Sequence, residues 1–197
     1  VDEITYHGYT FRPEDQYRHV DALRATVDRF DRRIGIRQGE NGAPSVNHQI
    51  HALCKHPWTE YSQAKWYLRR MLNDRRRGLW SSVFSIVDIR YNEVLLSMGL
   101  LRANDQKQVL YRKPAYYAAQ HTMSIFDNTV KPLGPVPFRV PEGEKVSVAA
   151  FRKADADMIL VWRDGATPSD ELAWKPLDVT VEKVAFKDPV YVDLLSG

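Results

Sequence analysis

Residues 34–42, with the sequence Ile-Gly-Ile-Arg-Gln-Gly-Glu-Asn-Gly, decide the fold class of this chain. The apolar start predicts a short buried strand, and the glycines and polar residues that follow predict a loop at its carboxyl end. Within that loop Glu40 stands between Gly39 and Gly42. A carboxylate in this position is exposed to a ligand rather than packed into a core, so Glu40 is the first candidate for chemistry.

Strand and helix patterns alternate on both sides of this stretch. Proline, acidic residues and Thr59 mark helix starts, because these residue types suit the first turn or the cap of a helix. Alternation of this kind predicts an α/β fold, with parallel strands joined by crossover helices. Strands are expected at residues 4–6, 34–36 and 79–89, and helices after Pro13, Thr59 and Pro114.

The composition changes near Val130. Residues 131–141 hold four prolines, which predict a rigid linker or edge segment. Beyond it, β-branched and aromatic residues alternate with polar ones, a pattern typical of antiparallel strands. These strands are expected at residues 146–151, 158–162, 179–184 and 190–194. The chain starts directly in a strand, without Met, and ends where a hairpin would turn, so we expect a piece of something longer.

Composition excludes several classes of function. The 197 residues carry a net charge of only +3, and basic stretches such as residues 74–77 include acids, so no nucleic-acid partner is expected. The single cysteine, Cys54, allows no internal disulfide or thiolate zinc site. His48, His51 and His56 have no acidic cluster nearby, so neither a metal nor another cofactor is expected. No apolar run of about 18 residues occurs, which argues against a membrane span.

The ordered motifs resemble those of retaining (β/α)₈ glycoside hydrolases, the clan that includes cellulases, mannanases and β-xylosidases. His7-Gly8-Tyr9 is similar to the His-x-Tyr after the sixth strand of that clan. Residues 38–45 are similar to its seventh-strand motif, which bears the nucleophile, and residues 79–89 and 113–118 are similar to its eighth strand and the stretch leading into its eighth helix.

The resemblance covers most of residues 4–126 and implies a fold in two domains. Residues 1–129 would form part of a TIM (β/α)₈ barrel, strands six to eight with their helices. Residues 130–197 would form a β-sandwich-like accessory domain of antiparallel strands. Three strand–helix units cannot close a barrel alone, so the resemblance also implies a partner, an N-terminal barrel segment or a second chain.

The implied chemistry is double displacement at a β-glycosidic bond of an oligosaccharide or polysaccharide. Glu40 would attack the anomeric carbon, while a second carboxylate about 5 Å away protonates the leaving group and later activates water. Tyr9 would hydrogen-bond Glu40 and help to keep it ionised, and His7 would position the substrate or the acid/base. Four further residues are expected to bind the sugar: Trp80 or Phe84 as a stacking platform, with Asn41 and Arg37 beside it.

The sequence departs from the clan in two places. The clan's acid/base is a Glu that follows Asn at the end of the fourth strand, a part of the barrel that precedes this chain. Arg37 stands where close relatives carry Trp. Four other glutamates lie on the wrong side of strands, on helices or in loops, and are not expected to replace the acid/base: Glu3, Glu14, Glu60 and Glu93.

Other interpretations remain open from sequence. The chain could be a non-catalytic barrel remnant that binds carbohydrate or serves as a structural partner, or a half-barrel that self-associates through its open strand edges. Glu40 could be a turn carboxylate, Trp80 and Phe84 could belong to the core, and Asp88 could pair with Arg90. Enzymes that resemble this chain are often secreted, but its sequence fixes no compartment.

Overall fold

A sheet of three parallel strands forms the N-terminal part of the molecule. The computed structural model describes residues 2–30, 33–48, 50–171, 175–182 and 184–197. The strands stand in the order β1-β2-β3 and both neighbouring pairs are parallel. The α/β alternation expected from the sequence is therefore present. The strands are β1 (Glu3–His7), β2 (Gly35–Glu40) and β3 (Trp80–Ser81).

The expected residues open or cap the helical segments: Pro13, Thr59 and Pro114. Pro13 starts a short 3₁₀ turn, Pro114 lies in the first turn of a helix, and the Thr59 hydroxyl accepts from the Ser62 backbone N–H in a reciprocal cap. Proline suits a first turn because it has no N–H to leave unpaired. The elements are η1 (Pro13–Gln16), α1 (Tyr17–Val27), α2 (Glu60–Arg76) and α3 (Pro114–Ile125). No described helix is long and apolar enough to cross a membrane.

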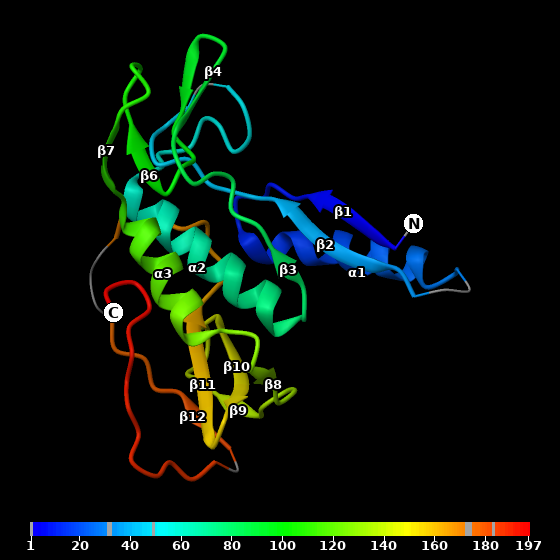
Figure 1. Cartoon of the computed structure of the whole chain (residues 1–197). Helices are drawn as coiled ribbons and strands as arrows, with labels where there is room; N and C mark the ends of the chain where they lie inside the picture. The colour runs from blue at the N-terminus through cyan, green and yellow to red at the C-terminus, as the bar shows by residue number, and fades with distance from the viewer. Residues whose placement is uncertain (1, 31–32, 49, 172–174, 183) are drawn as a thin grey trace.

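Helix α1 covers only one face of the parallel sheet (Figure 1). Leu23 and Val27 pack with Ile4 of β1 and with Ile34 and Ile36. Because strand side chains alternate between faces, the residues between these point the other way. They are Glu3, Thr5 and His7 of β1 and Arg37 of β2, and all four are exposed.

The third strand is much shorter than the pattern at residues 79–89 predicts. Only Trp80–Ser81 pairs with β2, and the chain then leaves the sheet. The backbone N–H of Phe84 donates to Asn41 O, and that of Ser85 lies 3.4 Å from Met98 O, so loop carbonyls replace the expected strand partner. Two antiparallel hairpins follow: β4 (Ile89–Tyr91) with β5 (Val94–Leu96), and β6 (Leu101–Ala103) with β7 (Val109–Arg112).

The C-terminal part contains one long antiparallel pair. The runs at residues 146–151 and 158–162 form β10 (Val146–Lys153) and β11 (Ala156–Arg163), as predicted. The run at residues 179–184 gives only β12 (Thr180–Val181), and its residue 183 lies outside the described residues. The strand expected at residues 190–194 is wrong: Val190 and Tyr191 are 86% and 79% exposed, so burial does not favour a strand there. Short strands β8 (Lys131–Pro132) and β9 (Phe138–Arg139) pair with β10 and β12.

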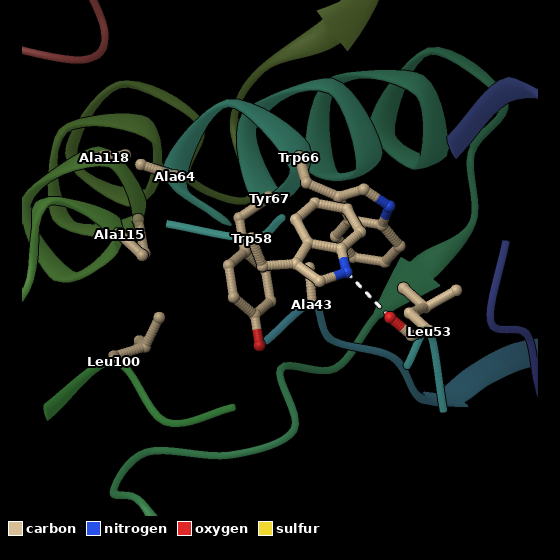
Figure 2. Packing of buried hydrophobic residues seen from close by; sticks show 10 residues of the cluster. Ala43, Leu53, Trp58, Ala64, Trp66, Tyr67, Leu100, Ala115 and Ala118 are labelled. Carbon is tan, nitrogen blue, oxygen red and sulfur yellow. Dashed lines mark hydrogen bonds between the residues drawn. The ribbon is translucent and has the colours of Figure 1, made fainter. Parts of the chain in front are cut away.

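Helices α2 and α3 lie side by side and hold the main core (Figures 1 and 2). Trp66 and Tyr67 of α2 are completely buried, and Figure 2 shows Trp58 packed beside them, with its indole N–H donating to Leu53 O at 2.8 Å. Small residues, Ala115 and Ala118, complete the contact from α3. The helix pair thus provides the rigid body on which the surrounding loops rest.

Helix α2 also holds the C-terminal part of the chain along its length. Arg69 Nη1 donates to Ala166 O at 2.6 Å, and Lys65 Nζ donates to Ser169 O at 3.1 Å. Near the other end of the helix, Arg75 Nη2 donates to Val130 O at 2.9 Å. These contacts cross the domain boundary expected at residue 129/130, and that boundary stays a prediction.

Candidate functional site

The first two strands bring His7 and Glu40 to the same edge of the sheet. Because β1 and β2 are parallel, their carboxyl ends meet there, and His7 is the register partner of Glu40. The register shifts after Tyr6, so that Gly39 is passed over. A side chain at residue 39 would overlap the Thr5 methyl group. Glycine therefore leaves room for the Thr5 methyl group at the irregularity that places Glu40 beside His7.

Both oxygens of the Glu40 carboxylate have a partner. The Tyr9 hydroxyl donates to Oε1 at 2.6 Å, and His7 Nδ1 lies 3.3 Å from Oε2. The Glu40 side chain is 31% exposed and that of His7 is 55% exposed, so a ligand can reach this edge. The structure thus brings together the three residues expected to be catalytic.

Tyr9 is a stable proton donor to this carboxylate. Burial raises the pKa of its hydroxyl well above the usual value, and the hydrogen bond to Glu40 and the charge of Glu40 raise it further. The hydroxyl therefore stays protonated across the neutral range. It fixes the orientation of Oε1 and leaves Oε2 as the oxygen beside the more exposed His7.

Buried hydrogen bonds fix the loop that follows Glu40. Gln63 Nε2 donates to Ala43 O at 2.8 Å, and the Ser45 backbone N–H donates to Ser97 O at 2.8 Å. Lys113 Nζ donates to the Ser45 hydroxyl at 2.9 Å. Hydrogen bonds of this kind in a low-dielectric interior fix a loop in one conformation.

Asn41 and Phe84 belong to this support in the structure. Asn41 is 1% exposed, its Nδ2 lies 3.3 Å from the Ser81 hydroxyl, and its Oδ1 has no hydrogen-bond partner among the described residues. Phe84 is partly buried, and its carbonyl accepts from the Tyr67 hydroxyl at 2.8 Å. Their contact with a sugar stays a prediction.

Trp80 lies on the open face of the sheet beside Arg37. Trp80 is 64% exposed, so it does not belong to the core. The two residues are register partners across β2 and β3, and the Arg37 guanidinium lies 5.7 Å from the centre of the indole ring. Arg37 Nε also lies 3.4 Å from Glu3 Oε1. An exposed indole of this kind presents a flat apolar surface to a ligand.

The other glutamates weighed from sequence have partners elsewhere. Glu14 accepts from Arg69 and Asn73, Glu60 accepts from the Tyr111 hydroxyl at 2.8 Å, and Glu93 pairs with Arg90. Glu3 stands four residues before His7 on β1, which places it roughly 13 Å along the strand from that edge. None of the four is positioned to act opposite Glu40.

Sequence reasoning missed the buried pair of Lys113 and Asp88. Lys113 Nζ lies 2.6 Å from Asp88 Oδ1, and both side chains are completely buried. The expected pair of Asp88 with Arg90 is wrong, since Arg90 pairs with Glu93 and Asp105 on the surface. Burial disfavours a charged ammonium and lowers the pKa of Lys113, while Asp88 opposes that shift. The only local signal was a lysine directly before the helix-opening Pro114.

His48, His51 and His56 are spread over the loop that follows Glu40. His48 is buried and its Nε2 accepts from the Ser97 backbone N–H at 3.3 Å, while the ring of His51 contacts that of Tyr91. His56 packs against Trp58. Within the described part of the chain, no group of three or more His, Cys, Asp or Glu residues is arranged to hold a metal ion.

Comparison with known proteins gives one distant structural neighbour to report. No family model matches the chain, and no curated protein matches it. The solved structure of an FMN-binding beta-glucuronidase from Facaelibacterium prausnitzii L2-6 superposes with a TM-score of 0.46 and 15% sequence identity. The match covers 86% of this chain and 33% of that one, so this chain spans about a third of the length of that protein.

Proposed function

We propose that this chain is part of a retaining (β/α)₈-barrel glycoside hydrolase, with Glu40 as the catalytic nucleophile. One observation carries the proposal: Glu40 stands at the carboxyl edge of parallel strands, with Tyr9 on one oxygen at 2.6 Å and His7 near the other at 3.3 Å. In barrels of this type, catalytic groups gather at that edge. The exposed face of β1–β3, opposite α1, would be the barrel interior.

The first step would form a bond between Glu40 Oε2 and the anomeric carbon. The bond from that carbon to the leaving oxygen breaks with its electron pair, and a second carboxyl group, in its protonated form, supplies the proton to that oxygen. Water then attacks the anomeric carbon of the glycosyl ester, gives its proton to this second carboxylate, and regenerates Glu40. The second carboxylate would come from an N-terminal barrel segment or another chain, because the glutamates at residues 3, 14, 60 and 93 have other partners.

The sugar would stack on Trp80. Its indole is 64% exposed on the face that also carries His7, and apolar sugar faces pack on aromatic rings of this kind. Arg37, beside the ring, would contact hydroxyl groups of the substrate. A polysaccharide or oligosaccharide with β-linkages is the substrate class that we propose.

Covalent trapping tests the nucleophile without an acid/base. In 2,4-dinitrophenyl 2-deoxy-2-fluoro-β-glycosides the leaving group departs without a proton, and the fluorine slows hydrolysis of the glycosyl enzyme. With a panel of gluco, galacto, manno and xylo reagents, we expect the intact mass to rise by one fluorosugar. Peptide mapping should place it on Glu40.

Two variants sharpen this test. Glu40→Gln should abolish labelling, whereas Glu60→Gln, at a surface carboxylate bonded to Tyr111, should leave it unchanged. Labelling at another carboxylate, or at none with any reagent, would overturn the assignment of the nucleophile.

A non-catalytic carbohydrate-binding role is the second candidate. It is favoured by the absence of a second carboxylate in hydrogen-bond or ion-pair contact with Glu40, His7 or Tyr9 in the described ranges. Binding of β-linked oligosaccharides that Trp80→Ala abolishes, in a protein that no fluorosugar labels, would support this role over the enzyme.

A further inference from the structure

A cavity of about 380 Å³ lies between the end of α2 and the C-terminal strands, outside the Glu40 site. Val148 and Phe151 of β10 line it together with Pro132, Val136 and Phe138. Arg76, in the last turn of α2, is the one charged residue among the described residues that line it. The size falls in the range of roughly 300–1,000 Å³ typical of sites for small molecules.

The guanidinium of Arg76 has no carboxylate partner among the described residues. Its Nη2 donates to Asn73 Oδ1 at 2.9 Å, and its face lies 5.5 Å from the centre of the Trp162 ring. The two acids whose charge reaches it have partners of their own: Asp164 accepts from the Ser147 hydroxyl, and Glu14 pairs with Arg69.

Partial burial of this charge without a carboxylate partner has an energetic consequence. Loss of hydrating water lowers the pKa of Arg76, and the charge of the neighbouring Arg77 lowers it further. The charged guanidinium is therefore less stable at this position than it would be in water. A buried cation is normally paired. An anion that entered the cavity would remove that cost.

A donor beside Arg76 has no acceptor among the described residues. The indole Nε1 of Trp162 is buried and has no hydrogen-bond partner in the described part of the chain. The Arg76 guanidinium lies over the Trp162 ring, so this unpaired indole N–H stands beside the charged residue of the cavity lining. Buried donors that lack acceptors are rare in proteins, and each calls for an explanation.

We propose that this cavity binds a small apolar carboxylate, with the carboxylate on Arg76 and the hydrocarbon or aromatic body against Phe138 and Val148. The charge complementarity selects an anion, and the apolar walls select a body without hydroxyl groups. This excludes a sugar from the cavity, so the site is independent of the proposed glycosidase site. No bond is made or broken in this binding.

Calorimetry with phenylacetate tests the proposal, with phenylacetamide as its neutral isostere. For a ligand of this size we expect a dissociation constant on the order of 0.1–1 mM. Phenylacetamide should bind at least roughly tenfold more weakly, because it cannot pair with a cation. Arg76→Gln should weaken phenylacetate by a similar factor and leave the amide unaffected.

Two further variants separate binding from folding. Arg77→Gln, beside Arg76 but bonded to Asp21, should bind phenylacetate as the parent does. Val148→Phe keeps Arg76 and fills the cavity, so it should abolish binding while far-ultraviolet circular dichroism stays unchanged. Equal affinity for acid and amide, equal affinity in Arg76→Gln, or no binding to the parent chain up to 10 mM, roughly tenfold above that range, would each overturn the proposal.

Discussion

Tyr9 lies two residues after the end of β1, and its hydroxyl donates to Glu40 Oε1 at 2.6 Å. We expect Tyr9→Phe to slow fluorosugar labelling of Glu40 by roughly 10- to 100-fold, because a hydrogen bond to a charged group contributes about 1.5–3 kcal/mol. Stopped-flow release of dinitrophenolate measures this rate. An unchanged rate would show that the hydroxyl does not act on the nucleophile.

Lys113 is a residue whose loss should strongly destabilise the fold. Lys113→Met would leave Asp88 charged and buried without its closest partner, 2.6 Å away. Breaking a buried pair in this way costs about 3–5 kcal/mol in the free energy of unfolding. Urea denaturation measures that loss.

The matched control for this pair is Arg90→Met. It removes a surface ion pair with Glu93 and Asp105 and should cost about 1 kcal/mol or less. If the two variants lost the same free energy, the buried pair would not be a major support of the loop after Glu40.

At this scale the sequence predicted the edge of the sheet but not its support. His7 and Glu40 are the last residues of their strands, and Tyr9 lies two residues after β1. The short-range sequence pattern was therefore enough to predict that they lie at one edge of the sheet. Asp88 and Lys113 are 25 residues apart, and charged residues are normally exposed. Only the tertiary fold shows that both are buried.

Among the elements, α2 depends on its cap at Thr59. The Thr59 hydroxyl accepts from the Ser62 N–H at 3.2 Å, and the Ser62 hydroxyl accepts in return from the Thr59 N–H at 2.8 Å. Thr59→Ala should reduce the free energy of unfolding by about 1 kcal/mol, within a range of roughly 0.5–2. Thermal and urea denaturation provide the measurement.

Ser124→Ala is a suitable comparison for the cap. The Ser124 hydroxyl donates only to the Gln120 carbonyl within α3 and is exposed, so its removal should change stability by about 0.5 kcal/mol or less. A loss of the same size in both variants would mean that the Thr59 cap adds nothing specific.

Helices were predicted better than late strands, for a physical reason. Caps and first-turn prolines act within a few residues, so Pro13, Thr59 and Pro114 mark their helices locally. A strand needs a partner: Phe84 and Ser85 find loop carbonyls instead, and residues 190–194 remain outside any sheet. Apolar alternation alone cannot tell whether a partner is present.

For the whole molecule, we expect acid to lower the folding stability through protonation of His48. Its buried Nε2 accepts from the Ser97 N–H, so protonation removes that bond, and burial is the main cause that lowers its pKa. The nearby His51, Lys113 and Arg102 lower that pKa further, while Asp88 opposes them. The folded state therefore binds a proton less readily than the unfolded chain, and stability falls as the pH drops below about 6.5.

Urea midpoints between pH 5 and 7.5 measure this dependence. We expect the free energy of unfolding to decline across that window more steeply in the parent chain than in His48→Gln. Parallel curves for the two proteins would show that other groups cause the acid sensitivity.

Helix α2 connects the parallel sheet, the helix pair and the C-terminal strands through side chains spaced along its length. Lys65, Arg69 and Arg75 all donate to backbone carbonyls of residues beyond 129. Every chain has backbone carbonyls, but these three lie where the side chains of α2 can reach them. A recombination event that exchanged residues 130–197 for an unrelated module would need to reproduce that spacing. We therefore expect residues 130–197 to be inherited together with α2 and not to be exchanged independently of it.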